Sequence, residues 1–95
     1  MLITYGKWGT KYRRYLIDHD NEKYYILLCS GELYEHIAAA DLKAERLYNA
    51  TVQELMRRQD VTPSLKRKNP EQWQKIMNKI SRLATEIVMG KMTSF

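Results

Sequence analysis

The segment from Glu32 to Gln59 constrains the fold most, because it contains neither glycine nor proline. One apolar residue recurs every three or four positions along it, which is the pattern of one face of an α-helix. This stripe consists of Leu33, Ile37, Ala40, Ala44, Leu47, Thr51 and Leu55. A single helix over residues 32–59 would be roughly 40 Å long, whereas a compact domain of this size is about 30–35 Å across. We therefore expect either a bend near residues 49–51 or a protruding helix that packs against a second copy.

Two shorter helices are predicted before this segment. The first runs over Lys7–Asp18 and has one aromatic-rich face. The second starts at Asp20 or Asn21, either of which can cap a helix N-terminus, and it ends before Gly31, since glycine tolerates the positive φ found there. Tyr24–Leu28 also fits a buried strand. We prefer a helix, because no other segment offers a strand for pairing.

Two further helices are predicted after it. Thr62-Pro63 and Asn69-Pro70 each place a capping residue before a proline at the first helical position. The second pair opens a final helix that ends near Gly90. Its apolar face is expected to contain Trp73, Ile76, Met77, Ile80, Leu83, Ala84 and Ile87. The fold class is therefore all-α: a small helical bundle of four to five helices with one long central helix. We expect a single domain over residues 1–95, with a flexible tail over residues 90–95.

Several classes of protein are disfavoured. Ninety-five residues form one domain at most, and a single cysteine cannot build a disulfide framework. No apolar run approaches the ~18 residues of a membrane span. Residues 1–5 lack the basic and apolar regions of a secretory signal. We therefore expect a cytoplasmic protein without a membrane segment.

Candidate catalytic and metal-binding groups are few. Cys29 lies in an apolar run, so we expect a buried, inert thiol. Glu32 and His36 are one helical turn apart, but a helical di-metal site needs such pairs on two helices. We expect surface ion pairs around Glu32, Glu35, His36 and Asp41 instead. The sequence thus predicts no metal, no cofactor and no enzymatic activity.

The basic residues are concentrated in the second half of the chain. Residues 1–48 contain seven Lys and Arg against seven Asp and Glu, whereas residues 49–95 contain nine against four. Such an imbalance indicates an anionic partner, most often nucleic acid. A solvated basic surface is the equally weighted alternative.

Two clusters supply the candidate nucleic-acid-binding residues. The main cluster consists of Arg57, Arg58, Lys66, Arg67 and Lys68, and the second strip consists of Lys7, Lys11 and Arg14. The three consecutive cations Lys66, Arg67 and Lys68 repel one another, and phosphates would relieve that repulsion. The alternative interpretation is that these cations lie in a solvated loop and bind nothing. A helix-turn-helix, if there is one, would lie in residues 62–70 and the final helix. Aromatics beside the second strip could stack on bases, although we favour a core position for Trp8 and Tyr12.

Several short pieces of the chain also follow a known pattern. In order they are Gly6-Lys7-Trp8-Gly9, Arg14-Tyr15-Leu16, Tyr24, Leu27-Leu28-Cys29-Ser30-Gly31-Glu32-Leu33, His36-Ile37, Val61-Thr62, Leu65-Lys66, Asn69-Pro70, Trp73, Met77-Asn78 and Glu86-Ile87-Val88. Together they resemble the TnpV family of transposon-encoded proteins over residues 6–89. The chain departs from the family at Asp60, where glycine is common. The resemblance implies a mobile-element protein with DNA as its natural context, and it supplies no catalytic residues.

These observations lead to one preferred function and two alternatives. We expect a non-enzymatic nucleic-acid-binding accessory protein of a mobile genetic element, acting in excision, integration or transcriptional regulation. One alternative is a small inhibitor of a host defence nuclease, of the anti-CRISPR type, which would bind a nucleic-acid-binding host protein through Tyr5, Tyr34 and Tyr48. The other is a homodimer formed through the Leu33–Leu55 stripe, which is compatible with either function.

Overall fold

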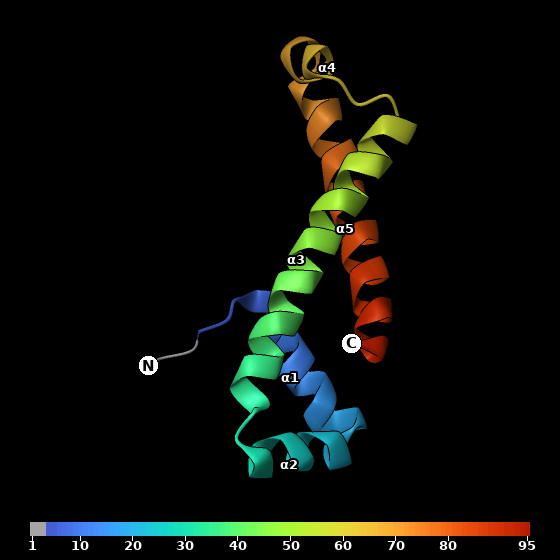
Figure 1. Ribbon diagram of the computed structural model, residues 1–95. Coiled ribbons are helices and arrows are strands. Elements are labelled where there is room, and N and C mark those ends of the chain that lie inside the picture. The colour runs from blue at the N-terminus through green and yellow to red at the C-terminus, as the bar shows by residue number, and fades with distance from the viewer. Residues whose placement is uncertain (1–3) are drawn as a thin grey trace. The chain divides into compact units, whose positions relative to one another are not determined.

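The computed structural model describes residues 4–95, and every regular element in that range is helical (Figure 1). The helices are α1 (Lys7–His19), α2 (Asn21–Ser30), α3 (Leu33–Arg58), α4 (Pro63–Lys68) and α5 (Pro70–Lys91), followed by a 3-10 turn, η1 (Met92–Ser94). The all-α prediction with five helices is confirmed. The expectation about a secretory signal concerns residues 1–5, of which the first three lie outside the described residues.

The chain divides into two compact units. Unit 1 comprises the residues up to Arg46 together with Met92–Phe95, and unit 2 comprises Leu47–Lys91. Helix α3 begins in unit 1 and ends in unit 2. It has 26 residues and continues through residues 49–51 without interruption, so residues 33–58 form one unbroken helix.

Local hydrogen bonds define where α2 begins and ends. The Asp20 carboxylate accepts a hydrogen bond from the Lys23 backbone N–H at 3.4 Å, which caps the N-terminus. Gly31 follows with φ of 79°, and the N–H groups of Gly31 and Glu32 return to the carbonyls of Leu28 and Leu27. This Schellman motif requires a left-handed residue, as predicted for Gly31.

The same motif ends α3, but with a residue that is not glycine. Asp60 has φ of 51°. Its N–H donates to the Arg57 carbonyl at 3.3 Å, and the Val61 N–H donates to the Met56 carbonyl at 2.9 Å. Because the left-handed conformation strains residues with a Cβ, a glycine would adopt the conformation of Asp60 with less strain.

The core of unit 1 comes from α1 and the first half of α3. Its fully buried apolar side chains are Trp8, Tyr12, Leu16, Leu33, Ile37, Ala40, Ala44 and Met92. The N–H of Gly9 donates to the Asp41 carboxylate at 2.6 Å. A Cβ at Gly9 would lie only 2.6 Å from a ring carbon of Tyr5, which explains a glycine inside a helix.

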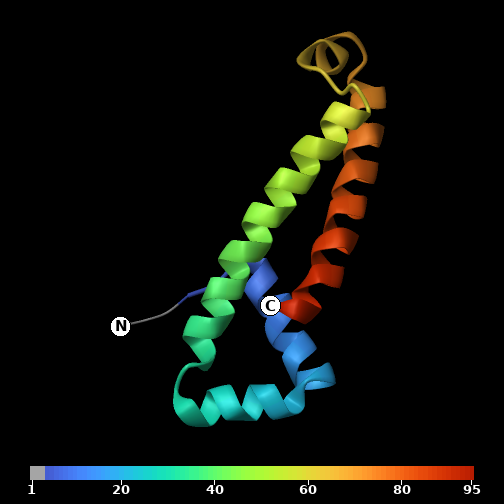
Figure 2. The same cartoon turned by 45° about the vertical axis from the view of Figure 1, so that its right-hand side comes forward.

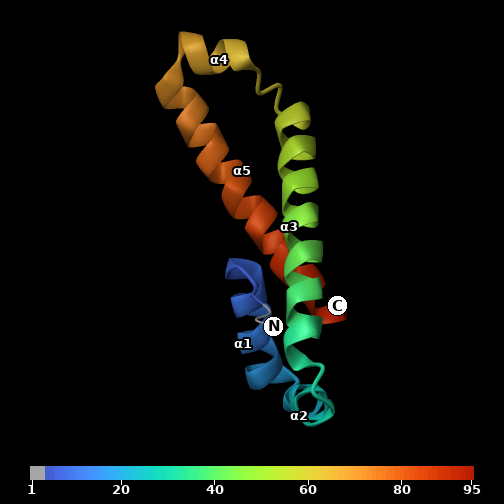
Figure 3. The same ribbon diagram turned by 60° about the vertical axis from the view of Figure 1, so that its left-hand side comes forward.

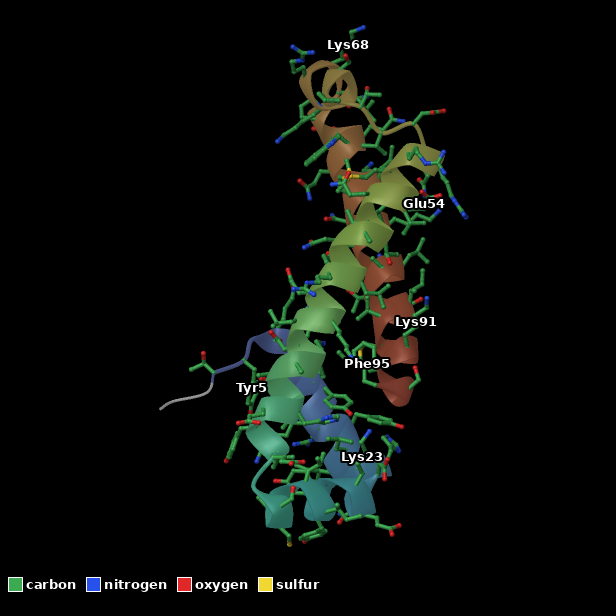
Figure 4. All side chains as sticks on the ribbon, in the orientation of Figure 1. Tyr5, Lys23, Glu54, Lys68, Lys91 and Phe95 are labelled. Carbon is green, nitrogen blue, oxygen red and sulfur yellow. The ribbon has the colours of Figure 1, made fainter. Side chains whose placement is uncertain are left out.

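The end of the chain differs from the expected tail. Helix α5 continues to Lys91, one residue past Gly90, and Met92 is only 2% exposed. The Phe95 carbonyl oxygen accepts hydrogen bonds from Lys23 Nζ at 2.7 Å and from the Tyr12 hydroxyl at 3.2 Å (Figure 4). These contacts with α1 and α2 hold the last residues in unit 1. They could not be predicted, since they join residues far apart in the sequence.

Helix α2 corrects the prediction for Cys29, which is exposed. The helix has no fully buried residue. Tyr24 and Leu27 are half-buried, whereas Tyr25 and Ile26 are 58% and 61% exposed. The sequence of α2 is apolar on all sides, but the described residues cover only part of it, and Cys29 lies on the uncovered part.

Unit 2 is a helical hairpin. The C-terminal part of α3 and helix α5 run in opposite directions and are joined by α4 (Figures 2 and 3). The fully buried apolar side chains are Ile80, Ala84 and Val88. The predicted apolar face of α5 is thus shifted at its end, because Val88 is buried while Ile87 is 41% exposed. The Tyr48 hydroxyl lies 2.8 Å from Ser81 Oγ and links the two long helices.

Candidate nucleic-acid interface

Unit 2 carries the whole net charge of the protein. It contains nine Lys and Arg against four Asp and Glu, whereas unit 1 contains seven of each. The formal net charge of +5 therefore belongs to residues 47–91. The boundary between the units lies within two positions of the point at which the sequence composition changes.

Arg57 and Arg58 share one carboxylate at the end of α3. Glu54 Oε1 lies 2.6 Å from Arg57 Nη2 and 3.0 Å from Arg58 Nε. The hydrogen bonds from Arg57 and then from Arg58 hold the pKa of Glu54 below its usual value. Both guanidinium groups are largely exposed. Two predicted phosphate ligands, Arg57 and Arg58, therefore lie side by side. The single negative charge of Glu54 balances one of their two positive charges.

Lys66, Arg67 and Lys68 form the last turn of α4 and are exposed. We expected a short turn of helix that starts at Pro63 and an exposed connection over these cations. The turn is capped as predicted, because the Thr62 hydroxyl accepts a hydrogen bond from the Leu65 N–H, and the helix continues through Lys68. Lys66 Nζ lies 4.7 Å from the Trp73 ring centre. Lys68 extends away from the helices (Figure 4). Within the described residues, none of the three forms an ion pair.

The second predicted strip lies on one exposed face of α1. Lys7, Lys11 and Arg14 are four and three residues apart. Arg14 Nε is 3.4 Å from the Asp18 carboxylate, and Lys7 Nζ is 5.4 Å from the Trp8 ring centre. Trp8 and Tyr12 are each 1% exposed. They belong to the core, as we favoured, so they offer no surface for base stacking.

Helix α5 carries a basic stripe that lies outside the predicted nucleic-acid-binding residues. Lys75, Lys79 and Arg82 are exposed on one face, four and three residues apart, and Glu86 follows four residues later. Helix α1 has the same spacing in Lys7, Lys11, Arg14 and Asp18. This repeated spacing was a usable signal in the sequence. None of the three α5 cations forms an ion pair within the part of the chain that the structure describes.

Of the candidate catalytic and metal-binding groups, His36 takes part in packing, whereas Cys29 is exposed. The ion pairs expected around Glu32 and His36 are not observed among residues 4–95. His36 Nε2 instead lies 2.8 Å from the Tyr12 hydroxyl. Burial, and then Lys23 and Lys43, lower the pKa of His36, while burial raises the pKa of Tyr12.

Residues 4–95 contain neither a metal-binding cluster nor a membrane-spanning helix. No group of three or more His, Cys, Asp or Glu side chains in this range could hold a metal ion. No helix in the same range is apolar enough over a sufficient length to cross a membrane.

The chain has no match among curated proteins and none among solved structures. The family model described as "Transposon-encoded protein TnpV" matches residues 2–93, which is nearly the whole chain. The protein therefore belongs to the TnpV family of transposon-encoded proteins.

Proposed function

We propose that this transposon-encoded protein binds nucleic acid through unit 2 and acts as a non-enzymatic accessory protein of its mobile element. One observation carries the proposal: three adjacent cations on α4 lie exposed, without a carboxylate partner among the described residues, in the unit that holds all the net charge. The role in excision, integration or regulation belongs to the same proposal.

Simple electrostatics supports a polyanionic partner. Lys66, Arg67 and Lys68 raise the free energy of the unbound protein by mutual repulsion, and closely spaced phosphates lower it. Each lysine or arginine that neutralises a phosphate also releases a condensed counterion. Arg57 and Arg58 add one unbalanced charge beside Glu54. A nucleic-acid backbone supplies negative charge at the density that this surface needs.

A salt titration tests the proposal. The probes are labelled DNA of roughly 20 nucleotides, single-stranded and annealed, a length chosen to exceed the site size of small domains. If six phosphates are neutralised, the affinity falls about a thousandfold between about 50 and about 200 mM salt. A salt-independent affinity, or no binding to either probe, overturns the proposal.

Matched double variants separate the α4 cations from general charge. Arg67→Ala with Lys68→Ala should reduce the logarithmic salt slope by about 1.8. Lys43→Ala with Arg46→Ala removes the same charge from exposed positions of α3 in unit 1. The Lys43→Ala, Arg46→Ala variant should reduce the salt slope by less than half of the reduction caused by the Arg67→Ala, Lys68→Ala variant. An equal loss from both pairs would show that net charge alone matters.

A protein partner is the second candidate function, and the exposed apolar side chains of unit 1 favour it. Tyr25, Ile26 and Leu28 are exposed on α2, and Tyr34 is 52% exposed on α3. Of the predicted anchors, Tyr34 is thus accessible, whereas Tyr5 and Tyr48 are half-buried. An inhibitor of a defence nuclease would be captured from a nuclease-treated lysate, and Tyr34→Ala would abolish the capture. Loss of all captured partners after nuclease treatment would favour nucleic acid.

A further inference from the structure

We infer that α5 is the helix that docks on duplex DNA, with Lys75, Lys79 and Arg82 facing the two phosphate walls of the major groove. This inference rests on the proposed function and names the class of nucleic acid. It assigns a role to three residues on the exposed face of α5, apart from the cations of α4.

The length of the stripe suits a duplex groove. At 1.5 Å per residue, Lys75 and Arg82 are about 10.5 Å apart along the helix axis. The major groove of B-form DNA is about 12 Å wide and admits an α-helix. Where the axis of α5 crosses the groove, long cationic side chains at the two ends of the stripe can therefore reach phosphates on opposite strands. Glu71 and Glu86 lie one turn beyond each end and limit the contact to this length.

The same face carries polar groups suited to base edges. Asn78 and Gln74 are exposed beside the stripe, and their side-chain amides form a hydrogen bond of 2.9 Å with each other. Asparagine and glutamine amides can pair with adenine in the major groove. The exposed surface of α5 thus combines a row of phosphate ligands with amides on one side of the row.

The aromatic residues argue against a single strand. Proteins that bind single strands stack bases on exposed aromatic rings, and sequence-specific RNA binding relies on the same contact. Unit 2 contains only two aromatic residues, Tyr48 and Trp73. Both are half-buried; the Tyr48 hydroxyl contacts Ser81, and Lys66 Nζ lies over the Trp73 ring. Neither ring is more than partly exposed, so unit 2 lacks the fully exposed aromatic side chains that stack on single-stranded bases.

The helix also favours DNA over duplex RNA. The major groove of A-form RNA is deep and narrow, so side chains on a helix cannot enter it. A stripe that is presented on one face of α5 therefore fits the B-form groove. The preferred ligand is duplex DNA, with affinity supplied mainly by its backbone.

A comparison of three probes tests the inference. The probes are a labelled DNA duplex of roughly 20 base pairs, one of its single strands, and an RNA duplex of the same sequence, all at about 100 mM salt. We expect the DNA duplex to bind at least about tenfold more tightly than either other probe, a difference of about 1.4 kcal/mol. Equal or tighter binding of the single strand or of the RNA duplex overturns the inference.

Variants of α5 and α4 distinguish this inference from the proposed function. Lys75→Ala, Lys79→Ala and Arg82→Ala together should abolish the preference for the DNA duplex and reduce its salt slope by about 2.7. A second variant replaces the same three residues with glutamine. Circular dichroism checks that the alanine and the glutamine variants are both folded. The Arg67→Ala, Lys68→Ala pair should weaken all three probes alike. If the α5 variants keep the preference, this inference fails alone; if no probe binds the wild type, the proposed function fails too.

Discussion

At the scale of single residues, Asp60 adopts a left-handed backbone conformation that is strained for a residue with a Cβ. A glycine at this position would relieve the strain. Its φ of 51° completes the hydrogen bonds that end α3. An L-residue with a Cβ is disfavoured there by about 1–2 kcal/mol, although glycine has more entropy to lose from the unfolded chain. The carboxylate itself forms no ion pair within the described residues.

We predict that Asp60→Gly raises the free energy of unfolding by about 0.5–1 kcal/mol, because the relief of strain exceeds the added entropy. Urea unfolding measures the change. Asp60→Asn is the control for the lost charge, and Gly31→Ala should destabilise by about 1 kcal/mol, since φ there is 79°. An Asp60→Gly variant no more stable than Asp60→Asn contradicts the explanation.

His36 makes the stability depend on pH. Burial, followed by Lys23 and Lys43, lowers its pKa below the ordinary 6.5. The unfolded chain therefore binds more protons than the folded chain between the two pKa values. The free energy of unfolding falls as the pH drops below about 6.5 and through the folded-state pKa.

We predict that the wild type loses more stability than His36→Gln when the pH is lowered from about 7 to about 5, since glutamine does not titrate. Urea unfolding at the two pH values gives the comparison, with each protein referred to its own value near neutral pH. Parallel losses in both proteins would show that His36 does not contribute.

At the scale of elements, the sequence predicted where the helices begin and end better than which of their faces are buried. Helix bounds depend on caps, glycine and proline within a few residues, so the limits of α2 and the start of α5 followed from Asp20, Gly31 and Pro70. Burial depends on which other element covers a face. The thiol of Cys29 is exposed for that reason.

We predict that Cys29 reacts with a maleimide or with Ellman's reagent in the native protein at a rate within about tenfold of the rate in denaturant, because no opening step precedes reaction of an exposed thiol. Timed labelling with mass detection measures both rates. Native labelling slower by a factor of a thousand would place Cys29 in a covered position. Cys29→Ser should remove the labelling without loss of helix.

At the scale of the whole molecule, the two units differ in charge although both carry a helix with the same basic spacing. The strip on α1 lies in a unit with no net charge, and Arg14 is paired with Asp18. The stripe on α5 lies in the unit with all the excess charge. The predicted dimer would pack through the stripe from Leu33 to Leu55. The first four side chains of that stripe, from Leu33 to Ala44, are already buried within the monomer.

We predict that Lys7→Ala, Lys11→Ala and Arg14→Ala together weaken duplex DNA binding less than the triple alanine variant of Lys75, Lys79 and Arg82. The salt slope should fall by at most about 1.8 for the α1 variant, since Arg14 is already paired with Asp18, against about 2.7 for the α5 variant. Fluorescence anisotropy at several salt concentrations measures both. Equal losses would assign the α1 strip an equal share of the phosphate contacts.

The sequence by itself determined the helical class, the limits of α2, the start of α5 and the uneven charge, because these depend on neighbours within one or two turns. Tertiary structure decided which side chains are buried, which are exposed and which contact another element. It covered Met92, left Cys29 exposed and placed Lys66 over Trp73. Burial follows from which elements meet, and the rotamers of long cations follow from what lies within their reach. Both depend on positions in space that local spacing along the chain does not encode.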